Sequence, residues 1–276
     1  MTEPRSWLFV PADSERKIAK ALDSEADAII FDLEDSVAPA QKATAREILK
    51  ALPKHSNGPQ WWVRVNPIGS EFHKDDLTLI GSAYVHGLVL PKAESGADVT
   101  ELAHRTGNIP IHAIVTETAA SLFGLLSYRQ PGSPLAAMSW GAEDLSAALG
   151  ASSKYGENGE LAFTYQMARS LCLAGAVAAG VQPVDGVFTD FRDSGGLKAE
   201  AEAARRDGFT GKLAIHPDQV AIINQAFTPS ADDIRDAEEI VAAFEAEPNA
   251  GVLSINGKMV DQPHLVQARR VLERVR

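Results

Sequence analysis

Residues 27–37 read DAIIFDLEDSV, and this stretch shows the pattern on which the interpretation of the whole chain rests. An apolar run at residues 28–31 is followed directly by the acidic residues Asp32, Glu34 and Asp35. The run is continuous rather than alternating, which is typical of a parallel strand covered on both faces. The pattern therefore predicts a buried strand with carboxylates at its carboxyl end.

The same kind of run recurs at regular intervals, and helical patterns lie between the runs. The expected strands are residues 7–10, 28–31, 61–65, 87–90, 111–115, 135–140, 185–188 and 213–215. The helical patterns cover residues 14–22, 39–52, 97–105, 162–179, 195–206 and 217–227. Alternation of strand and helix eight times predicts a (β/α)₈ TIM barrel over residues 1–228. A doubly wound open sheet is the alternative, but the expected Gly-rich turn is missing from FVPADSER, residues 9–16.

The chain continues after the eighth strand and helix, although a barrel closes without further elements. Residues 229–276 are therefore expected to form a C-terminal helical extension. It contains a helical pattern at 232–246, a short strand or turn at 251–255 and a basic helix at 265–275.

Composition excludes several classes of function. The 276 residues carry a formal net charge of −11, which argues against duplex nucleic acid as a partner. Cys172 is the single cysteine, so an intrachain disulfide or a multi-cysteine metal site cannot form. No apolar run approaches the roughly 20 residues that span a bilayer. We expect no membrane association, no secretory signal and a cytoplasmic location.

Charged residues follow most of the expected strands. In a barrel of this kind the active site lies at the carboxyl ends of the strands, so these side chains are expected to meet at one rim. Besides the acids after the second strand, they are Arg64, Lys92, Glu117, Asp144, Asp185 and His216.

Carboxylates gathered in this way repel one another unless a cation lies among them. Oxygen donors without a cysteine or histidine cluster favour Mg²⁺, with Mn²⁺ as the alternative. The planar fork of Arg64 suits a ligand carboxylate. Together these features point to a 2-oxo acid or a 2-hydroxy acid as ligand.

Several motifs, in order along the chain, carry a resemblance to a known family. They are RSWLFVPAD (5–13), WVRVNP (62–67), GLVLPKAE (87–94), VTET (115–118), SWGAEDL (139–145), GFTGKLAIHPDQV (208–220) and MVDQPHLVQARRVL (259–272). The chain resembles the citrate lyase β-subunit-like family of the HpcH/HpaI aldolase superfamily over essentially its whole length.

The resemblance implies a Mg²⁺-dependent carbon–carbon lyase in a homo-oligomer, usually a trimer. Its reaction would cleave or form a 3-hydroxyacyl-CoA ester, such as citryl-CoA or malyl-CoA, with an acyl-CoA and a 2-oxo acid as the products of cleavage. Two alternatives remain open, namely a CoA-independent class II pyruvate aldolase and a non-catalytic accessory subunit of a lyase complex.

The resemblance also implies roles for individual residues. Glu117 and Asp144 match the metal ligands, and Arg64 matches the arginine that binds the oxo-acid carboxylate. Asp261 matches an aspartate that reaches a neighbouring subunit as an acid or base, so the extension is expected to dock there. Backbone amides of Gly141, Ala142, Glu143 and Asp144 are expected to approach the same oxo-acid carboxylate. Glu34 and Asp35 match acids that lie behind the metal site. Rim positions are matched by Lys92, Lys212 and His216.

Overall fold

The computed structural model describes residues 3–53, 58–130, 132–157 and 159–275. By their internal contacts these residues divide into two compact units, Glu3–Asn224 and residues 225–275. Each unit is described by itself below. The sequence pattern had placed the end of the barrel domain at residue 228.

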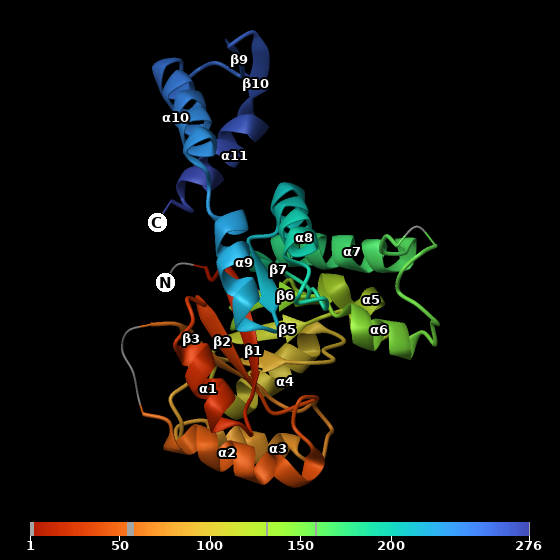
Figure 1. The fold of residues 1–276 in the computed structure, drawn as a ribbon. Coiled ribbons are helices and arrows are strands. Elements are labelled where there is room, and N and C mark those ends of the chain that lie inside the picture. The colour runs from red at the N-terminus through yellow and green to blue at the C-terminus, as the bar shows by residue number, and fades with distance from the viewer. Residues whose placement is uncertain (1–2, 54–57, 131, 158, 276) are drawn as a thin grey trace. The chain divides into compact units, whose positions relative to one another are not determined.

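Eight parallel strands form a closed barrel in which each strand pairs with its neighbours along the chain, and β8 pairs with β1 (Figure 1). This confirms the predicted (β/α)₈ fold. The strands are β1 Ser6–Pro11, β2 Ala28–Asp32, β3 Gln60–Arg64, β4 Gly87–Leu90, β5 Ile111–Ile114, β6 Leu135–Ser139, β7 Gln182–Asp185 and β8 Gly211–Ala214.

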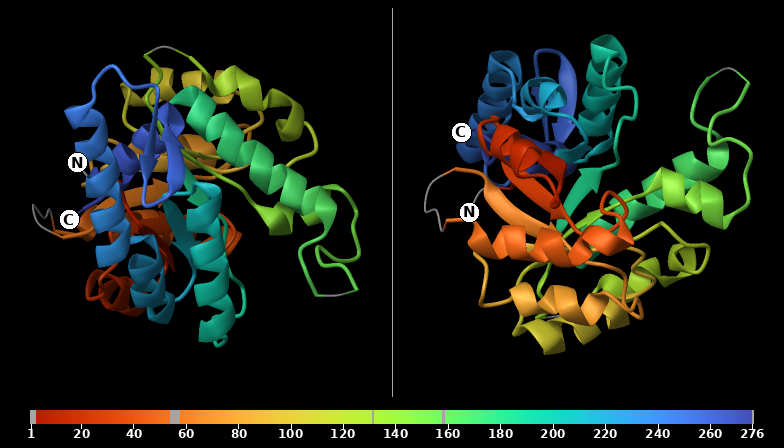
Figure 2. Two further views of the ribbon diagram at one scale, coloured as in Figure 1. Left: turned by 90° about the horizontal axis from the view of Figure 1, so that it is seen from above. Right: turned by 60° about the horizontal axis from the view of Figure 1, so that its bottom comes forward.

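Helices follow the strands and lie outside the barrel (Figure 1). They are α1 Glu15–Leu22, α2 Lys42–Ala51, α3 His73–Asp76, α4 Gly96–Thr106, α5 Ser121–Gly124, α6 Ala142–Ala148, α7 Phe163–Ala179, α8 Ser194–Asp207 and α9 Val220–Phe227. Short 3₁₀ turns are η1 Pro39–Gln41, η2 Leu77–Leu79, η3 Leu125–Tyr128 and η4 Pro217–Gln219. In both views of Figure 2 the green loop between α6 and α7 extends away from the barrel. Among the described residues, no helix has the length and apolar character needed to cross a bilayer.

The seventh strand lies three residues earlier than the sequence pattern predicted, at Gln182–Asp185 rather than 185–188. The sequence pattern did not reveal the start of this strand, because neither Gln182 nor Pro183 is typical of a buried strand. Gln182 is nevertheless buried and its side-chain amide donates to the Pro4 carbonyl at 2.7 Å. The carbonyl of Pro183 accepts from the Thr210 amide at 3.0 Å, so the proline still pairs through its oxygen.

Large side chains fill the interior of the barrel. The rings of Trp7 and Trp62 lie 5.0 Å apart, and His112 lies edge-on to Trp7 at 4.6 Å. Burial lowers the pKa of His112 to about 3, so its ring is neutral and Nε2 hydrogen-bonds the Ser139 hydroxyl at 2.9 Å. The inward-facing cluster comprises Trp7, Ala28, Ile30, Trp62, Val89, Ile114, Ala137, Val184 and Leu213. These side chains form a packed floor beneath the rim.

Asp185 and Lys212 do not belong to the rim, which corrects two expectations from the sequence. Side chains alternate between the two faces of a strand. Val184 and Leu213 point into the barrel, so their neighbours Asp185 and Lys212 point outward, toward the helical layer. Both are fully buried there, with Lys212 Nζ 2.8 Å from Asp185 Oδ2.

Two further ion pairs complete this buried network between the barrel wall and the helices. Arg169 of α7 donates to Asp185 at 2.8 Å, and Glu200 of α8 accepts from Lys212 at 2.7 Å. Burial opposes the charge of Asp185, but Lys212 and Arg169 outweigh it and hold the Asp185 pKa at about 2. The network fixes α7 and α8 to β7 and β8.

The C-terminal unit contains α10 Ala231–Ala246, β9 Val252–Ile255, β10 Lys258–Asp261 and α11 Gln262–Leu272. The sequence analysis missed β10, which pairs antiparallel with β9. The turn between them is Asn256-Gly257, and both residues have positive φ, 51° and 76°. Asn-Gly is a strong hairpin signal for that reason. Phe244, Val260 and Leu265 form a small core of the unit.

We expect Lys212→Met to destabilise the protein by about 3–5 kcal/mol, because it removes one partner of a buried ion pair and leaves Asp185 undercompensated. Urea unfolding at neutral pH measures the difference. The control is Lys198→Met, which removes an exposed lysine 3.8 Å from Glu202 and should cost less than about 1 kcal/mol. Equal losses for the two variants would contradict a structural role for the Asp185 network.

Candidate active site

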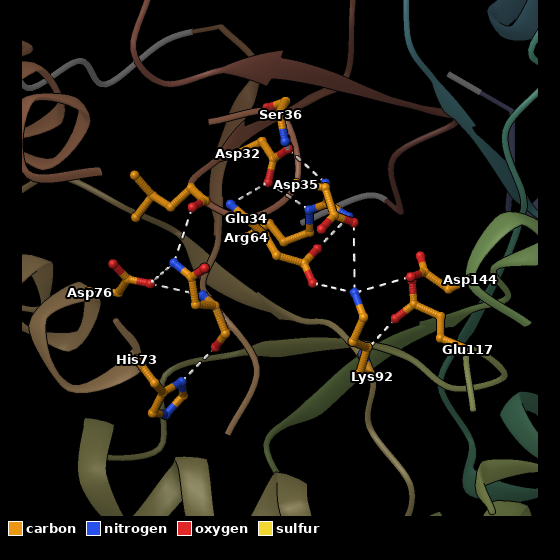
Figure 3. A network of polar contacts seen from close by, with 12 residues as sticks. Asp32, Glu34, Asp35, Ser36, Arg64, His73, Asp76, Lys92, Glu117 and Asp144 are labelled. Carbon is orange, nitrogen blue, oxygen red and sulfur yellow. Dashed lines mark hydrogen bonds and ion pairs between the residues drawn. The ribbon is translucent and has the colours of Figure 1, made fainter. Parts of the chain in front are cut away.

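Asp32 and Arg64 form the inner ion pair of the rim (Figure 3). They are register partners at the ends of β2 and β3, and they follow the inward-facing Ile30 and Trp62 by two residues. Both side chains therefore point inward at the same level. Arg64 Nε and Nη2 donate to the two Asp32 oxygens at 2.7 and 2.6 Å. Sequence analysis had not assigned a role to Asp32, although it is the first carboxylate after the apolar run.

Arg64 is held from two more directions. Nη1 lies 2.9 Å from Glu34 Oε2, and the guanidinium lies over the Phe9 ring at 4.7 Å. Burial opposes its charge, but Asp32 outweighs burial and raises the Arg64 pKa above its usual range. A guanidinium has five N–H donors. The hydrogen bonds to Asp32 use two of these donors, and the contact with Glu34 is an ion pair without a hydrogen bond, so the other N–H groups can bind a ligand carboxylate.

The loop that carries Glu34 and Asp35 is fixed by buried polar contacts. Lys42 Nζ donates to the Leu33 and Glu34 carbonyls at 2.7 and 2.9 Å. The Asn66 side chain also donates to the Leu33 carbonyl at 3.0 Å. Lys42 and Asn66 were not recognised in the sequence because their role depends on contacts between distant segments.

Lys92 connects the two sides of the rim. Nζ lies 2.6 Å from Glu34 Oε1, 3.2 Å from Asp144 Oδ1 and 3.7 Å from Asp35 Oδ2. Its main-chain N–H donates to Glu117 Oε2 at 2.5 Å. Burial lowers the pKa of Lys92, but the Glu34 carboxylate and the other acids outweigh burial and raise this pKa above its usual range. Figure 3 shows Lys92 between Glu34 on one side and Glu117 and Asp144 on the other.

Glu117 and Asp144 differ in exposure. Glu117 is buried after β5, whereas Asp144 is partly exposed in the first turn of α6. Burial raises the pKa of Glu117 to about 8; the Lys92 amide opposes this shift and Asp144 adds to it. A Cβ on Gly141 would lie 2.7 Å from Glu117 Cγ, so only glycine lets the start of α6 approach this carboxylate so closely.

The donor set at the rim is made of hard oxygens. Within the described ranges no group of three or more His, Cys, Asp or Glu residues is arranged to hold a metal ion. Mg²⁺ does not require such a group, because it commonly binds one or two carboxylates and keeps several waters or substrate oxygens. Glu117 and Asp144 therefore suit a pair of carboxylate ligands for one Mg²⁺ ion. The Lys92 ammonium already contacts Asp144, so this carboxylate already has a cation beside it.

The other predicted residues lie at varying distances from this cluster. Ala142 and Glu143 begin α6 beside Asp144, and the Glu143 carboxylate pairs with Lys154. His216 follows β8 and is stacked on Phe191 at 4.8 Å, with Nδ1 accepting from the Asp218 amide. Its contacts are thus separate from the acidic cluster.

Asp261 belongs to the C-terminal unit. It is the residue before α11, and its Oδ1 lies 2.6 Å from His264 Nδ1. The two units are described separately, so the role of Asp261 toward a neighbouring subunit stays a prediction.

A groove that the sequence analysis did not predict lies beside the rim. It has a volume of about 460 Å³ and runs between β1, α1 and the segment after β8. Phe9, beneath Arg64, lines the groove together with Arg16, Lys17, Lys20 and His216. In the described part of the chain, Arg16, Lys17 and Lys20 form no ion pair. In the sequence, the helical spacing of these three basic residues on α1 was the signal that could have revealed the groove.

Several known proteins are similar to this chain over most of its length. Among similar proteins, the (3S)-malyl-CoA thioesterase of Cereibacter sphaeroides is 39% identical over 97% of this chain and 93% of its own length. The mitochondrial citramalyl-CoA lyase of Homo sapiens is 35% identical over 97% of this chain and 84% of its own. The crystal structure of CitE from Mycobacterium tuberculosis with magnesium, acetoacetate and coenzyme A has a TM-score of 0.85 and 36% identity, covering 98% of this chain and 97% of that one.

Two family models also match. Residues 162–276 match the C–C bond lyases of the TIM-barrel fold, which identifies the chain as a carbon–carbon lyase. Residues 5–217 match the model described as HpcH/HpaI aldolase/citrate lyase. With its closed barrel and its carboxylate-rich rim, the chain belongs to the HpcH/HpaI aldolase/citrate lyase family.

Proposed function

We propose that this chain is a Mg²⁺-dependent lyase that cleaves or forms a 3-hydroxyacyl-CoA ester with a carboxylate on the hydroxyl-bearing carbon. The observation that carries the proposal is the position of Arg64, which uses two of its five N–H groups on Asp32 and lies at the same rim as Glu117 and Asp144. A carboxylate clamp next to two hard anionic ligands suits a ligand that offers a carboxylate and a neighbouring oxygen. Cleavage would release an acyl-CoA and a 2-oxo acid.

Glu117 and Asp144 would hold the metal ion. The bound ion supplies positive charge where the hydroxyl oxygen becomes negative as the carbon–carbon bond breaks. The magnesium in the related CitE structure supports the choice of ion. Mn²⁺ has the same oxygen preference and is the alternative ion.

Arg64 would orient the substrate carboxylate. Asp32 and Glu34 fix the guanidinium plane before the substrate arrives, which reduces the ordering cost of binding. Amides of Gly141, Ala142, Glu143 and Asp144 would approach the same carboxylate, a role that follows from the family resemblance. Glu34 and Asp35 would support Arg64 or waters on the metal.

The basic groove would take the coenzyme part of the ester. Its lining includes Phe9, under Arg64, and three exposed cations that carry no protein counter-charge in the described ranges. Phosphate groups are the natural partners of such cations. This arrangement favours a CoA ester over a small aldehyde, and so argues against a CoA-independent aldolase.

Proton transfer completes the reaction. The hydroxyl group gives its proton to solvent water, and its oxygen forms the carbonyl of the 2-oxo acid as the carbon–carbon bond breaks. The electron pair of that bond passes to the acyl-CoA as an enolate, and the enolate carbon then gains a proton. Asp261 of a neighbouring subunit would exchange that proton, in a homo-oligomer that the family resemblance predicts to be a trimer. The cytoplasmic location expected from the sequence also stays a prediction.

Hydrolysis of the thioester is the second candidate function. The relative from Cereibacter sphaeroides is named a thioesterase, and it covers 97% of this chain. Hydrolysis would release free CoA and a hydroxy diacid without breaking a carbon–carbon bond. Free CoA thiol and 2-oxo acid are therefore measured separately in the experiment below.

The purified protein should convert citryl-CoA, malyl-CoA or citramalyl-CoA to acyl-CoA and 2-oxo acid when Mg²⁺ is present, and chelation by EDTA should abolish the reaction. Glu117→Ala and Asp144→Ala should each lower kcat/KM at least about 10²-fold, because each removes an anionic ligand. Glu101→Ala, an exposed α4 carboxylate paired with Arg105, is the matched control. Thiol release without 2-oxo acid would favour hydrolysis, and no turnover of any ester would favour an accessory subunit.

We expect the double variant Arg16→Ala/Lys20→Ala to raise KM for the CoA ester by about tenfold with little change in kcat, because exposed cations contribute binding rather than chemistry. Added salt should weaken binding to the native enzyme more than to the variant. Lys50→Ala on α2, which removes an exposed pair with Glu47, serves as control. An unchanged KM would exclude the groove as the coenzyme site.

Mixing Arg64→Ala with Asp261→Ala tests the role of the C-terminal unit. If Asp261 acts in a neighbouring subunit, mixed oligomers contain some sites with both residues intact and should regain part of the activity that each variant lacks. Subunit exchange is checked independently with two fluorescent labels. Exchange without recovered activity would mean that Asp261 acts within its own chain or takes no part.

A further inference from the structure

Lys92 contacts four carboxylates of the rim. Its ammonium lies 2.6 Å from Glu34, 3.2 Å from Asp144 and 3.7 Å from Asp35, and its main-chain amide binds Glu117. Within the described ranges, Lys92 is the one cationic side chain within salt-bridge distance of Asp144.

The backbone conformation of Lys92 allows its amide and its ammonium to contact different carboxylates at the same time. Its φ angle is 51°, in the left-handed region that a lysine rarely adopts. This conformation turns the N–H toward Glu117 while the side chain reaches Glu34 and Asp144 (Figure 3). The position of Glu117 thus depends on the main chain of Lys92, whereas the position of Asp144 depends on its ammonium.

The charge balance of the rim explains why a cation is needed there. Arg64 donates two hydrogen bonds to Asp32 and forms an ion pair with Glu34. Burial raises the Glu117 pKa and the Arg64 charge opposes that rise from a longer distance, but among the described residues Arg64 forms no ion pair with Glu117 or Asp144. Without another cation, the outer carboxylates would repel each other across the mouth of the barrel.

We propose that the ammonium of Lys92 stands in for the divalent cation at Asp144 and is displaced from that carboxylate when the ion binds. The inference rests on the proposed function, because it takes Glu117 and Asp144 as the metal ligands. It makes Lys92 a positioning residue with two opposite effects. The ammonium stabilises the metal-free rim, and the same ammonium competes with the ion and weakens its binding.

Titration of Mn²⁺, followed by the electron paramagnetic resonance of the free ion, tests this directly. Lys92→Asn should bind Mn²⁺ about tenfold more tightly than the native protein, because a competing and repelling charge is gone. In EDTA the same variant should have a lower Tm than the native protein, and Mg²⁺ should raise its Tm by more. Asparagine tolerates the left-handed backbone, so the amide contact with Glu117 is retained.

Two further variants make the result decisive. Lys92→Gly removes the same ammonium at no backbone cost and replaces Lys92→Asn if that variant does not fold. Lys154→Asn removes an ammonium bound to Glu143, the neighbour of Asp144, and should leave Mn²⁺ affinity within about twofold. Native protein that fails to bind Mn²⁺ would overturn the metal pair and with it this proposal. Native binding that is unchanged or weakened in Lys92→Asn would overturn the role of Lys92 alone.

Discussion

The ion pair between Asp32 and Arg64 is the interaction around which the rim is organised. A guanidinium that points into the mouth of a barrel keeps its charge when it is buried, and it destabilises the fold unless a carboxylate lies beside it. The register of β2 and β3 supplies that carboxylate, because Asp32 and Arg64 are paired positions on the same face. Asp32 also accepts from the amides of Glu34 at 2.9 Å and Ser36 at 3.1 Å, so the ion pair shapes the loop that carries the next acids.

The remaining charges follow from that centre. Glu34 divides its two oxygens between Arg64 and Lys92, and thereby links the inner ion pair to the outer carboxylates. Lys92 in turn contacts Glu117 and Asp144, which come from segments after two other strands. The interior below is filled with aromatic and aliphatic side chains, so ligands are confined to the rim. Chemistry at this end is therefore built from two cations, Arg64 and Lys92, that lie between carboxylates on five adjacent strand ends.

The strands and much of this rim could be predicted because the local signals were strong. Continuous apolar runs ending in charged residues gave seven strands to within about two residues and placed Glu34, Arg64, Lys92, Glu117 and Asp144 at their ends. The prediction failed where the residue types are unusual for a buried strand, as for Gln182 and Pro183 at the start of the strand Gln182–Asp185. It also failed where a face had to be chosen, since Asp185 and Lys212 lie on the outer side of the wall. The hairpin after Ile255 was overlooked despite its Asn-Gly turn.

By itself, the sequence determined the alternation of strand and helix, the acidic composition, and the motifs that assign the chain to its family, because these depend only on local pattern. The tertiary structure decided which charges meet. Strand register places Asp32 opposite Arg64. Lys42 and Asn66, which come from distant segments, fix the loop that carries Glu34. Phe9 lines the basic groove and also lies under the Arg64 guanidinium. Each of these contacts links residues far apart in the chain. Their partners are set by barrel closure and side-chain direction, which no local pattern specifies.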